Sequence, residues 1–267
     1  MSRLPRTLEL AVTALLLAAG ASAEQQPQDV ASQVFSTGGR QVALLELYTS
    51  EGCSSCPPAD RWLSARRDDP ELWKSYVPLA FHVDYWNYLG WKDRFAQPAY
   101  SDRQRRYIEE DAARVVYTPG FFSAGKEWLG WRNGRGVQAG DGDGGALTAT
   151  VLDGAVAIDY VPATDARGGF EINVALLGMG IESEVAAGEN RGRRLQHDFV
   201  VLEHRRLPLE RRGAGYAADT NIAPADVAAT GYALAVWVSA RGTQRPLQAT
   251  GGFLEPKPAA RSAAARR

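Results

Sequence analysis

Two cysteines separated by two residues are the feature of this sequence with the clearest chemistry. Cys53 and Cys56 are the only cysteines among the 267 residues, with Ser54 and Ser55 between them. Two thiols at this spacing form a short disulfide or exchange one with another molecule, and the attacking group is the thiolate. We therefore expect Cys53 to attack a substrate sulfur and Cys56 to resolve the resulting mixed disulfide.

The elements on either side of the pair are suited to lowering the pKa of a thiol. A strand with a central apolar run is predicted over 41–49, and a short helix with Asp60 in its first turn over 59–67. A helix N-terminus presents free N–H groups and the positive end of its dipole, which stabilise a thiolate. The prolines at 57–58 lack N–H donors, so we expect the helix to begin near the second proline and to lower the pKa of Cys53 only modestly.

Two other interpretations of the cysteine pair stay open. A disulfide that closes about four residues stabilises a protein by only about 2 kcal/mol in the chain-entropy model, which weakens the case for a purely structural bond. A structural zinc needs four ligands, and further cysteines do not exist, but His82 offers a third ligand for copper. The alternatives are a non-catalytic binding module with a structural disulfide and a copper-binding protein that uses Cys53, Cys56 and His82. The leading interpretation requires no metal and no organic cofactor.

A second strand and the loop after it supply further candidate side chains. Residues 76–86 are rich in β-branched and aromatic side chains, which predicts a strand. His82 and Asp84 are two residues apart and share one face of that strand, so we expect them to shuttle a proton for thiol exchange. The simpler alternative is a histidine hydrogen-bonded at the end of a strand. Trp86 and Trp91 are candidates for a substrate-binding groove, although packing within the loop also explains aromatic residues of this kind.

The rest of the N-terminal half predicts a helix and a hairpin. Ser101 and Gln104 form a capping-box signature for a helix that runs to about residue 113. Thr118-Pro119 follows, and residues 121–131 predict two short strands joined by a tight turn. Six glycines between residues 133 and 145 then mark a linker or a long loop.

Short alternating runs dominate the sequence after residue 148. Turn-rich pieces separate these runs, and several short strands at such spacing predict a β-sandwich. We therefore expect an α/β domain over 40–148, followed by an all-β, sandwich-like domain over 149–255. The runs lie at 155–161, 170–177, 181–187, 195–202, 232–240 and 247–254.

The N-terminal residues have the layout of a secretory signal peptide. Two arginines within the first six residues precede an apolar stretch at 10–19, and an A-x-A cleavage signature ends at Ala23. The apolar stretch is shorter than the roughly 20 residues of a membrane-spanning helix, so removal of 1–23 is expected rather than a retained anchor. The mature protein is then periplasmic or secreted and carries no membrane attachment. We expect a flexible segment at 24–39 and a disordered tail at 256–267.

Composition and charge exclude other classes of partner. Hydrophobic residues make up 45% of the chain, enough for a packed core, and the formal net charge is −1. Such a balance provides no electrostatic attraction for nucleic acid or for a membrane surface. The expected partners are therefore protein thiols or disulfides, and nothing in the sequence chooses an oligomeric state.

These motifs resemble known proteins at two levels. Their order resembles the thioredoxin fold, in which a Thr-Pro bond is cis and packs against the Cys-x-x-Cys loop. More narrowly, the sequence resembles an exported bacterial family catalogued as domain of unknown function 1223. The resemblance implies that the α/β domain is thioredoxin-like and that Thr118-Pro119 is cis and presents a backbone edge to the substrate. It rests on ELYTSEGCSSCPPADRWL at 46–63, AFHVDYWNYLGWKDRFA at 80–96, RQRRY at 103–107, VYTP at 116–119 and GENRGRRLQHDFVV at 188–201.

The sequence departs from redox-active thioredoxins at the proton acceptor. Those proteins carry a buried acid on the first strand, six residues before the first cysteine. Leu47 occupies that position in this chain, and Glu46 beside it points to the opposite face of the strand. Asp84 or Glu46 would have to take over the role.

Overall fold

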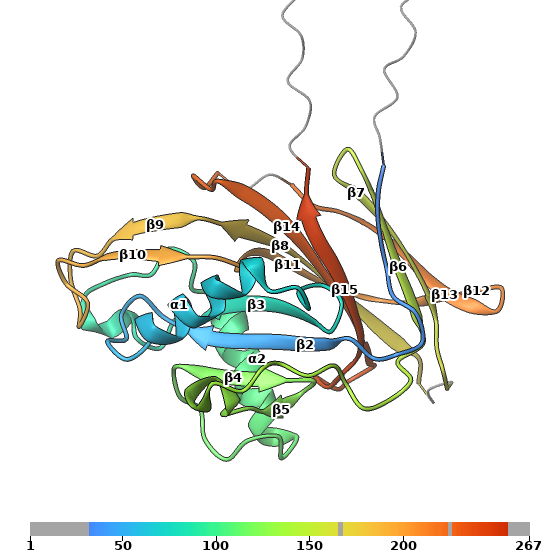
Figure 1. The fold of residues 1–267 in the computed structure, drawn as a ribbon, viewed down its shortest axis with the longest axis horizontal. Helices are drawn as coiled ribbons and strands as arrows, with labels where there is room; N and C mark the ends of the chain where they lie inside the picture. Colours follow the sequence, from blue (N-terminus) through green and yellow to red (C-terminus); the bar gives the residue numbers. More distant parts are fainter. Residues whose placement is uncertain (1–31, 165–167, 224–225, 256–267) are drawn as a thin grey trace, which may run out of the picture. The chain divides into compact units, whose positions relative to one another are not determined.

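The structure is a computed structural model that describes residues 32–164, 168–223 and 226–255. Together they contain fifteen strands, two α-helices and three short 3₁₀ helices, arranged as in Figure 1. The expected signal peptide at 1–23 and the expected tail at 256–267 lie outside the described residues. Neither described α-helix is long and apolar enough to cross a membrane.

An eight-stranded mixed sheet contains strands from both halves of the sequence (Figure 1). In order across the sheet the strands are β15 (Pro246–Leu254), β14 (Gly231–Ala240), β8 (Phe170–Met179), β11 (Val200–Pro208), β3 (Tyr76–His82), β2 (Ala43–Thr49), β4 (Gly120–Ser123) and β5 (Lys126–Glu127). β3 is parallel to both of its neighbours, β2 and β11, and the other pairs are antiparallel. The hairpin predicted over 121–131 is confirmed by the pairing of β4 with β5.

This sheet shows that the expected fold class is wrong. The described chain is mostly β-structure, and strands from 40–148 and 149–255 hydrogen-bond to one another instead of forming an α/β thioredoxin-like domain beside a separate sandwich. The junction lies between β3 and β11, where the N–H of Ala80 donates to the carbonyl of Phe199 at 2.8 Å. β3 is buried along its whole length, and a buried strand needs a partner at each edge. Local patterns do not reveal which distant strand provides that partner.

A five-stranded antiparallel sheet packs against one face of the large sheet. In order across it are β1 (Gln33–Ser36), β6 (Ala146–Leu152), β7 (Ala155–Val161), β13 (Gly215–Asn221) and β12 (Glu210–Arg212). β1 lies in the segment 24–39, where we expected no regular structure, and it pairs with β6. Leu147 and Ile158 of this sheet share an apolar core with Val174 of β8 and Val236 of β14.

β8 and β14 are apolar at nearly every position because both of their faces are buried. In β14, Leu234 and Val236 belong to the core under the five-stranded sheet, whereas Ala235 and Trp237 belong to a second core. The second core lies on the opposite face and also contains β2 and β3. Alternate side chains of one strand thus join two cores.

Two helices and a small hairpin surround the end of β2, which places the cysteine turn among them. α1 (Pro57–Ser64) follows the cysteines directly, and α2 (Pro98–Glu109) begins three residues before the expected capping box at Ser101. β9 (Ile181–Glu184) and β10 (Arg194–His197) pair with each other, and β10 lies beside α1 (Figure 1). A residue of the second half of the chain can therefore reach the cysteines.

Candidate functional site

The two cysteines lie in the turn between β2 and α1. The helix begins at Pro57, within one residue of the predicted start, and Cys56 is its N-cap residue. The N–H of Cys56 donates to the carbonyl of Cys53 at 3.2 Å, which closes the turn. Both cysteines are free thiols, and both are buried, with exposed fractions of 1% for Cys53 and 0% for Cys56. The exposed fraction of the side chain therefore does not distinguish the two thiols.

The pKa values of the two thiols move in opposite directions. The hydrogen bond with Cys56 lowers the pKa of Cys53 to about 6, against the effect of burial, and the hydroxyl of Ser55 at 3.2 Å contributes to the lowering. Burial raises the pKa of Cys56 well above its ordinary value, and the hydrogen bond to Cys53 raises it further. At neutral pH the pair thus holds a thiolate at Cys53 and a thiol at Cys56.

The Thr118–Pro119 bond is cis, as the resemblance implied, and its threonine contacts the cysteine turn. Cys53 Sγ lies 3.9 Å from the carbonyl oxygen of Thr118. Trp86 Nε1 donates to Thr118 Oγ1 at 2.8 Å, so this tryptophan belongs to the same surface. The structure thus brings together five of the predicted site residues, namely Cys53, Cys56, Thr118, Pro119 and Trp86.

His82 and Asp84 do not form the predicted pair. β3 ends at His82, so the alternation of the strand stops before it reaches Asp84. His82 Nδ1 lies 2.8 Å from Asp93 Oδ2, while Asp84 accepts a hydrogen bond from Ser101 Oγ. Burial lowers the pKa of His82, but the charge and hydrogen bond of Asp93, with the charges of Glu51 and Asp60, together outweigh burial and raise it to about 9. His82 is therefore a buried imidazolium at neutral pH rather than a group that shuttles protons there.

Two further candidates also have other partners. Trp91 Nε1 donates to Glu51 Oε2 at 2.7 Å, so its polar edge faces the interior instead of an open groove. Glu46 accepts a hydrogen bond from Arg103 Nε of α2 at 2.7 Å and is fully buried in that ion pair. Glu46 is thus occupied elsewhere in the core, and neither it nor Asp84 replaces the proton acceptor.

Five buried titratable side chains form a cluster behind the cysteine turn, and the sequence pointed to only one of them, His82, as a site residue. His197 Nε2 lies 3.4 Å from Glu51 Oε1, and its Nδ1 lies 4.0 Å from Asp60 Oδ2. The rings of His197 and His82 are 5.1 Å apart. Buried ionisable groups are costly unless they are paired, so such a cluster next to two free cysteines indicates a functional site. The members of this acid–histidine cluster are Glu51, Asp60, His82, Asp93 and His197.

One of the missed residues had a signal in the sequence. Asp60 follows Cys56 by four residues, a spacing that places two side chains on one face of a helix. Glu51 follows β2, Asp93 lies in the loop between β3 and α2, and neither had a distinguishing pattern in the sequence. His197 lies on a strand of the second half of the chain, and only the tertiary structure brings it to the turn.

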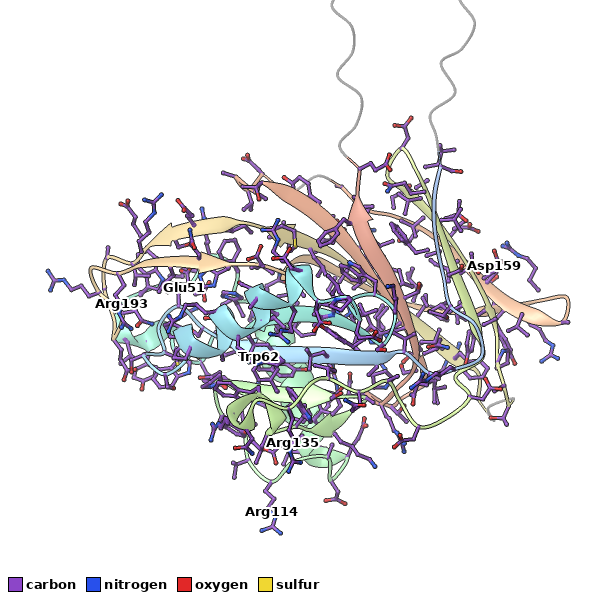
Figure 2. All side chains as sticks on the ribbon, in the orientation of Figure 1. Glu51, Trp62, Arg114, Arg135, Asp159 and Arg193 are labelled. Atoms are coloured by element: carbon purple, nitrogen blue, oxygen red, sulfur yellow. The ribbon has the colours of Figure 1, made fainter. Side chains whose placement is uncertain are left out.

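The loop between β9 and β10 closes over the cysteine turn. Asn190, which is fully buried, donates from Nδ2 to the carbonyl oxygen of Glu51 at 2.8 Å and to that of Cys53 at 2.9 Å. Arg193 Nη1 donates to Asn190 Oδ1 at 2.8 Å. Figure 2 shows Glu51 and Arg193 at the same end of the structure. The loop thus fixes the backbone that carries the Cys53 sulfur.

An open hollow of about 480 Å³ lies beside the same loop. Glu189 Oε2, at its wall, accepts a hydrogen bond from the N–H of Ser54 at 2.9 Å, so the hollow adjoins the cysteine turn. Tyr88, which precedes its wall residue Leu89, is 77% exposed. The lining residues are Leu89, Ala187, Gly188, Glu189 and Arg191.

The geometry of the turn, the cis bond and the loop can be compared with known proteins. A family model described as a protein of unknown function, DUF1223, matches residues 44–239. The chain belongs to the DUF1223 family. This confirms the narrower of the two resemblances, and the match includes the cysteine turn, Thr118–Pro119 and the β9–β10 loop. No curated protein matches the sequence.

Two solved structures are similar to this DUF1223 protein in fold. Protein AGR_C_4864 from Agrobacterium tumefaciens is 24% identical with a TM-score of 0.54, and the match covers 80% of this chain and 94% of that one. HBP35 of Porphyromonas gingivalis is 13% identical with a TM-score of 0.54, and the match covers 86% of this chain and 82% of that one. At these identities the likeness concerns the fold alone.

The described residues of the DUF1223 protein provide no ready metal site. No three histidine, cysteine, aspartate or glutamate side chains within them are placed to hold a metal ion. His82 binds Asp93 rather than turning toward Cys53 and Cys56. The copper site considered from the sequence is therefore not formed by this arrangement.

Proposed function

We propose that this DUF1223 protein is an exported thiol–disulfide oxidoreductase that uses Cys53 and Cys56. The observation that carries the proposal is the position of the cysteine pair, with Cys56 capping α1 and Cys53 Sγ 3.9 Å from the carbonyl oxygen of the cis Thr118–Pro119 bond. The opposite displacement of the two pKa values supports it. A Cys53 thiolate attacks a substrate disulfide and releases one substrate thiolate, which leaves a mixed disulfide. The Cys56 thiol then loses its proton, attacks Cys53 and releases the second substrate thiolate. Export rests on the signal-like residues 1–23.

Protein thiols or disulfides are the proposed substrates. The backbone at Thr118, next to Cys53 Sγ, offers an edge along which an extended peptide can lie. The hollow beside the β9–β10 loop offers apolar contacts at Leu89 and charged ones at Glu189 and Arg191. A peptide that carries the reacting sulfur would contact both surfaces.

The burial of both thiols favours a second candidate function. A disulfide that is closed off from solvent is seldom reduced, and the protein would then be a binding module with a structural bond. The two functions differ in how readily cellular thiols reduce the Cys53–Cys56 disulfide.

The reduction potential of the Cys53–Cys56 pair separates the two functions. It is measured by equilibrating the purified protein with glutathione and dithiothreitol buffers, and we expect a value above about −230 mV. A value below about −300 mV would instead establish the structural disulfide. Cys53→Ser and Cys56→Ser should abolish turnover of protein disulfides, whereas Ser54→Ala, an exposed neighbour, should retain it.

The pH dependence of alkylation tests the assignment of the attacking sulfur. We expect the rate at which iodoacetamide modifies the reduced protein to rise through an inflection near pH 6, because the Cys56 hydrogen bond lowers the pKa of Cys53. Cys56→Ala removes that hydrogen bond and should move the inflection upward. An inflection near pH 8.5 in the unaltered protein would contradict the assignment.

A further inference from the structure

The second step of the proposed exchange releases a proton from a fully buried thiol. Cys56–SH and the mixed disulfide at Cys53 become the internal disulfide, a substrate thiolate and one proton. Cys56 has an exposed fraction of 0%, and burial holds its pKa well above the ordinary value. Bulk water does not reach this sulfur, so a protein group must take the proton.

Thr49 connects Cys56 to the carboxyl group of Asp60. Thr49 lies at the end of β2 with an exposed fraction of 0%. Its hydroxyl donates to Asp60 Oδ1 at 2.8 Å, and the same side chain hydrogen-bonds the Cys56 thiol. The hydroxyl thus lies between the group that must lose a proton and a carboxylate that can accept one.

Asp60 also lines a cavity beside α1. The cavity has a volume of about 320 Å³ and lies between α1 and the β9–β10 hairpin. Arg61 and Arg194 in its wall are exposed, so the cavity communicates with solvent. The lining residues are Pro57, Asp60, Arg61, Glu182, Arg194, Leu195, Gln196 and His197.

We propose that Thr49, Asp60 and this cavity form the proton path of Cys56. The proton of Cys56 Sγ passes to Thr49 Oγ1 as the threonine proton passes to Asp60 Oδ1, and Asp60 releases it into the cavity. During reduction of the internal disulfide the same path returns a proton to Cys56. This inference rests on the proposed function, and it assigns the role that the sequence had offered to Asp84 or Glu46.

The groups around Asp60 set the pH range in which the path works. Burial raises the pKa of Asp60, and Asp93 adds to this, while His197, His82 and the hydroxyl of Thr49 oppose it. A carboxyl group whose pKa lies closer to neutrality is a better proton acceptor at physiological pH. These groups reach Asp60 from β2 (Thr49), β3 (His82), the loop before α2 (Asp93), β10 (His197) and the start of α1 (Cys56).

A stopped-flow reaction of the reduced protein with 5,5′-dithiobis(2-nitrobenzoate) separates the two steps. Cys53 releases one nitrothiobenzoate in a phase that depends on reagent concentration. Cys56 releases a second one in a first-order phase, which requires loss of the Cys56 proton. Both phases are recorded from pH 4 to pH 8 for the unaltered protein, Asp60→Asn, Thr49→Val and the control Asp84→Asn. Thr49→Val preserves side-chain shape and removes the hydroxyl.

We expect Asp60→Asn to leave the first phase unchanged and to slow the second phase by about 100-fold at neutral pH, the lower range for a general base. In the unaltered protein the rate of the second phase should fall at low pH, where Asp60 is protonated. This fall should be absent in Asp60→Asn. Thr49→Val should slow the second phase in the same direction, and Asp84→Asn should leave both phases unchanged.

Two different results would overturn the inference. In one, the rate of the second phase in Asp60→Asn keeps the pH dependence of the unaltered protein, whatever its absolute value. Asp60 would then not belong to the proton path, and the exchange function would stand. Absence of a first phase at Cys53 in the unaltered protein would overturn the exchange function and the path together.

Discussion

The buried ion pair of His82 and Asp93 accounts for much of the charge balance behind the cysteines. Both side chains have exposed fractions of 0%, and their contact is 2.8 Å. Burial raises the pKa of Asp93, but the charge and hydrogen bond of His82, with the backbone N–H groups of Glu51 and Phe95, together outweigh burial and lower it. The pair thus holds one positive and one negative charge next to Glu51, whose carboxylate also accepts from Trp91. We interpret His82 as a fixed counter-charge for these carboxylates.

The imidazolium of His82 predicts a pH-dependent stability in a cysteine-free background. The pKa of His82 is about 9 in the folded protein and about 6.5 in an unfolded chain. Its stabilisation is therefore complete below pH 6.5 and is lost as the pH rises through 9. That difference corresponds to about 3 kcal/mol, which we expect to see in urea unfolding of Cys53→Ala/Cys56→Ala between these pH values.

The cysteine-free background is needed because Cys53 titrates in the same range with the opposite sign. His82→Gln in that background serves as the comparison, and its free energy of unfolding should lose this pH dependence. Equal slopes with and without His82 would show that the histidine is not charged in the folded protein.

At the scale of elements, the β9–β10 hairpin determines the geometry of the cysteine turn. Asn190 donates hydrogen bonds to two backbone carbonyls of the turn, and Gly188 of the same loop has a positive φ of 74°, which favours glycine. The strand β10 carries His197 into the acid–histidine cluster. The β9–β10 hairpin therefore both covers the cysteine turn and forms one wall of the cavity at Asp60.

The substitution Asn190→Ala tests whether the β9–β10 loop limits access to the cysteine turn. The substitution leaves the carbonyls of Glu51 and Cys53 without their buried donor, so we expect the free energy of unfolding to fall by about 2 kcal/mol. The turn should also open more often, and iodoacetamide should modify Cys53 faster at a fixed pH. Arg191→Ala, an exposed residue of the same loop, is the matched control and should change neither quantity. Unchanged alkylation in Asn190→Ala would show that the loop does not limit access to Cys53.

At the scale of the whole molecule, the described residues belong to one compact unit rather than to an α/β part and a β part. Besides the pairing of β3 with β11, Gln248 Oε1 of β15 accepts from the N–H of Val42 at 2.8 Å. The same glutamine donates from Nε2 to the carbonyl of Gly145 at 2.7 Å, across the boundary expected from the sequence. Separation of the two halves would break buried hydrogen bonds at several points.

We therefore expect a fragment of residues 32–148 to remain unfolded, because β3 would lose its β11 edge and the turn would lose Asn190. The full chain should unfold in one transition when circular dichroism and tryptophan fluorescence are compared. A fragment that shows its own cooperative thermal transition would contradict this expectation, as would two separate transitions in the full chain.

Local features of this protein were predictable, and long-range ones were not. The strand over 155–161 and the β4–β5 hairpin follow from alternation and turn residues within about ten positions. The strand predicted over 76–86 is real but ends at His82, which separates Asp84 from the face that it was expected to share. The fold class was wrong because a local pattern does not specify the partner of a buried strand edge.

Local sequence was enough to predict the cysteine turn, the helix that follows it, the Thr118–Pro119 element and the family, because each depends on residues close together in the chain. The residues that surround that turn were visible only in the tertiary structure. It joined the strands into one eight-stranded sheet and gave Asp84 a partner away from His82. It also brought Asn190 to Cys53 and His197 to Asp60 from the second half of the chain. Such contacts arise when buried strand edges and buried charges find partners across long separations, and no local pattern records that choice.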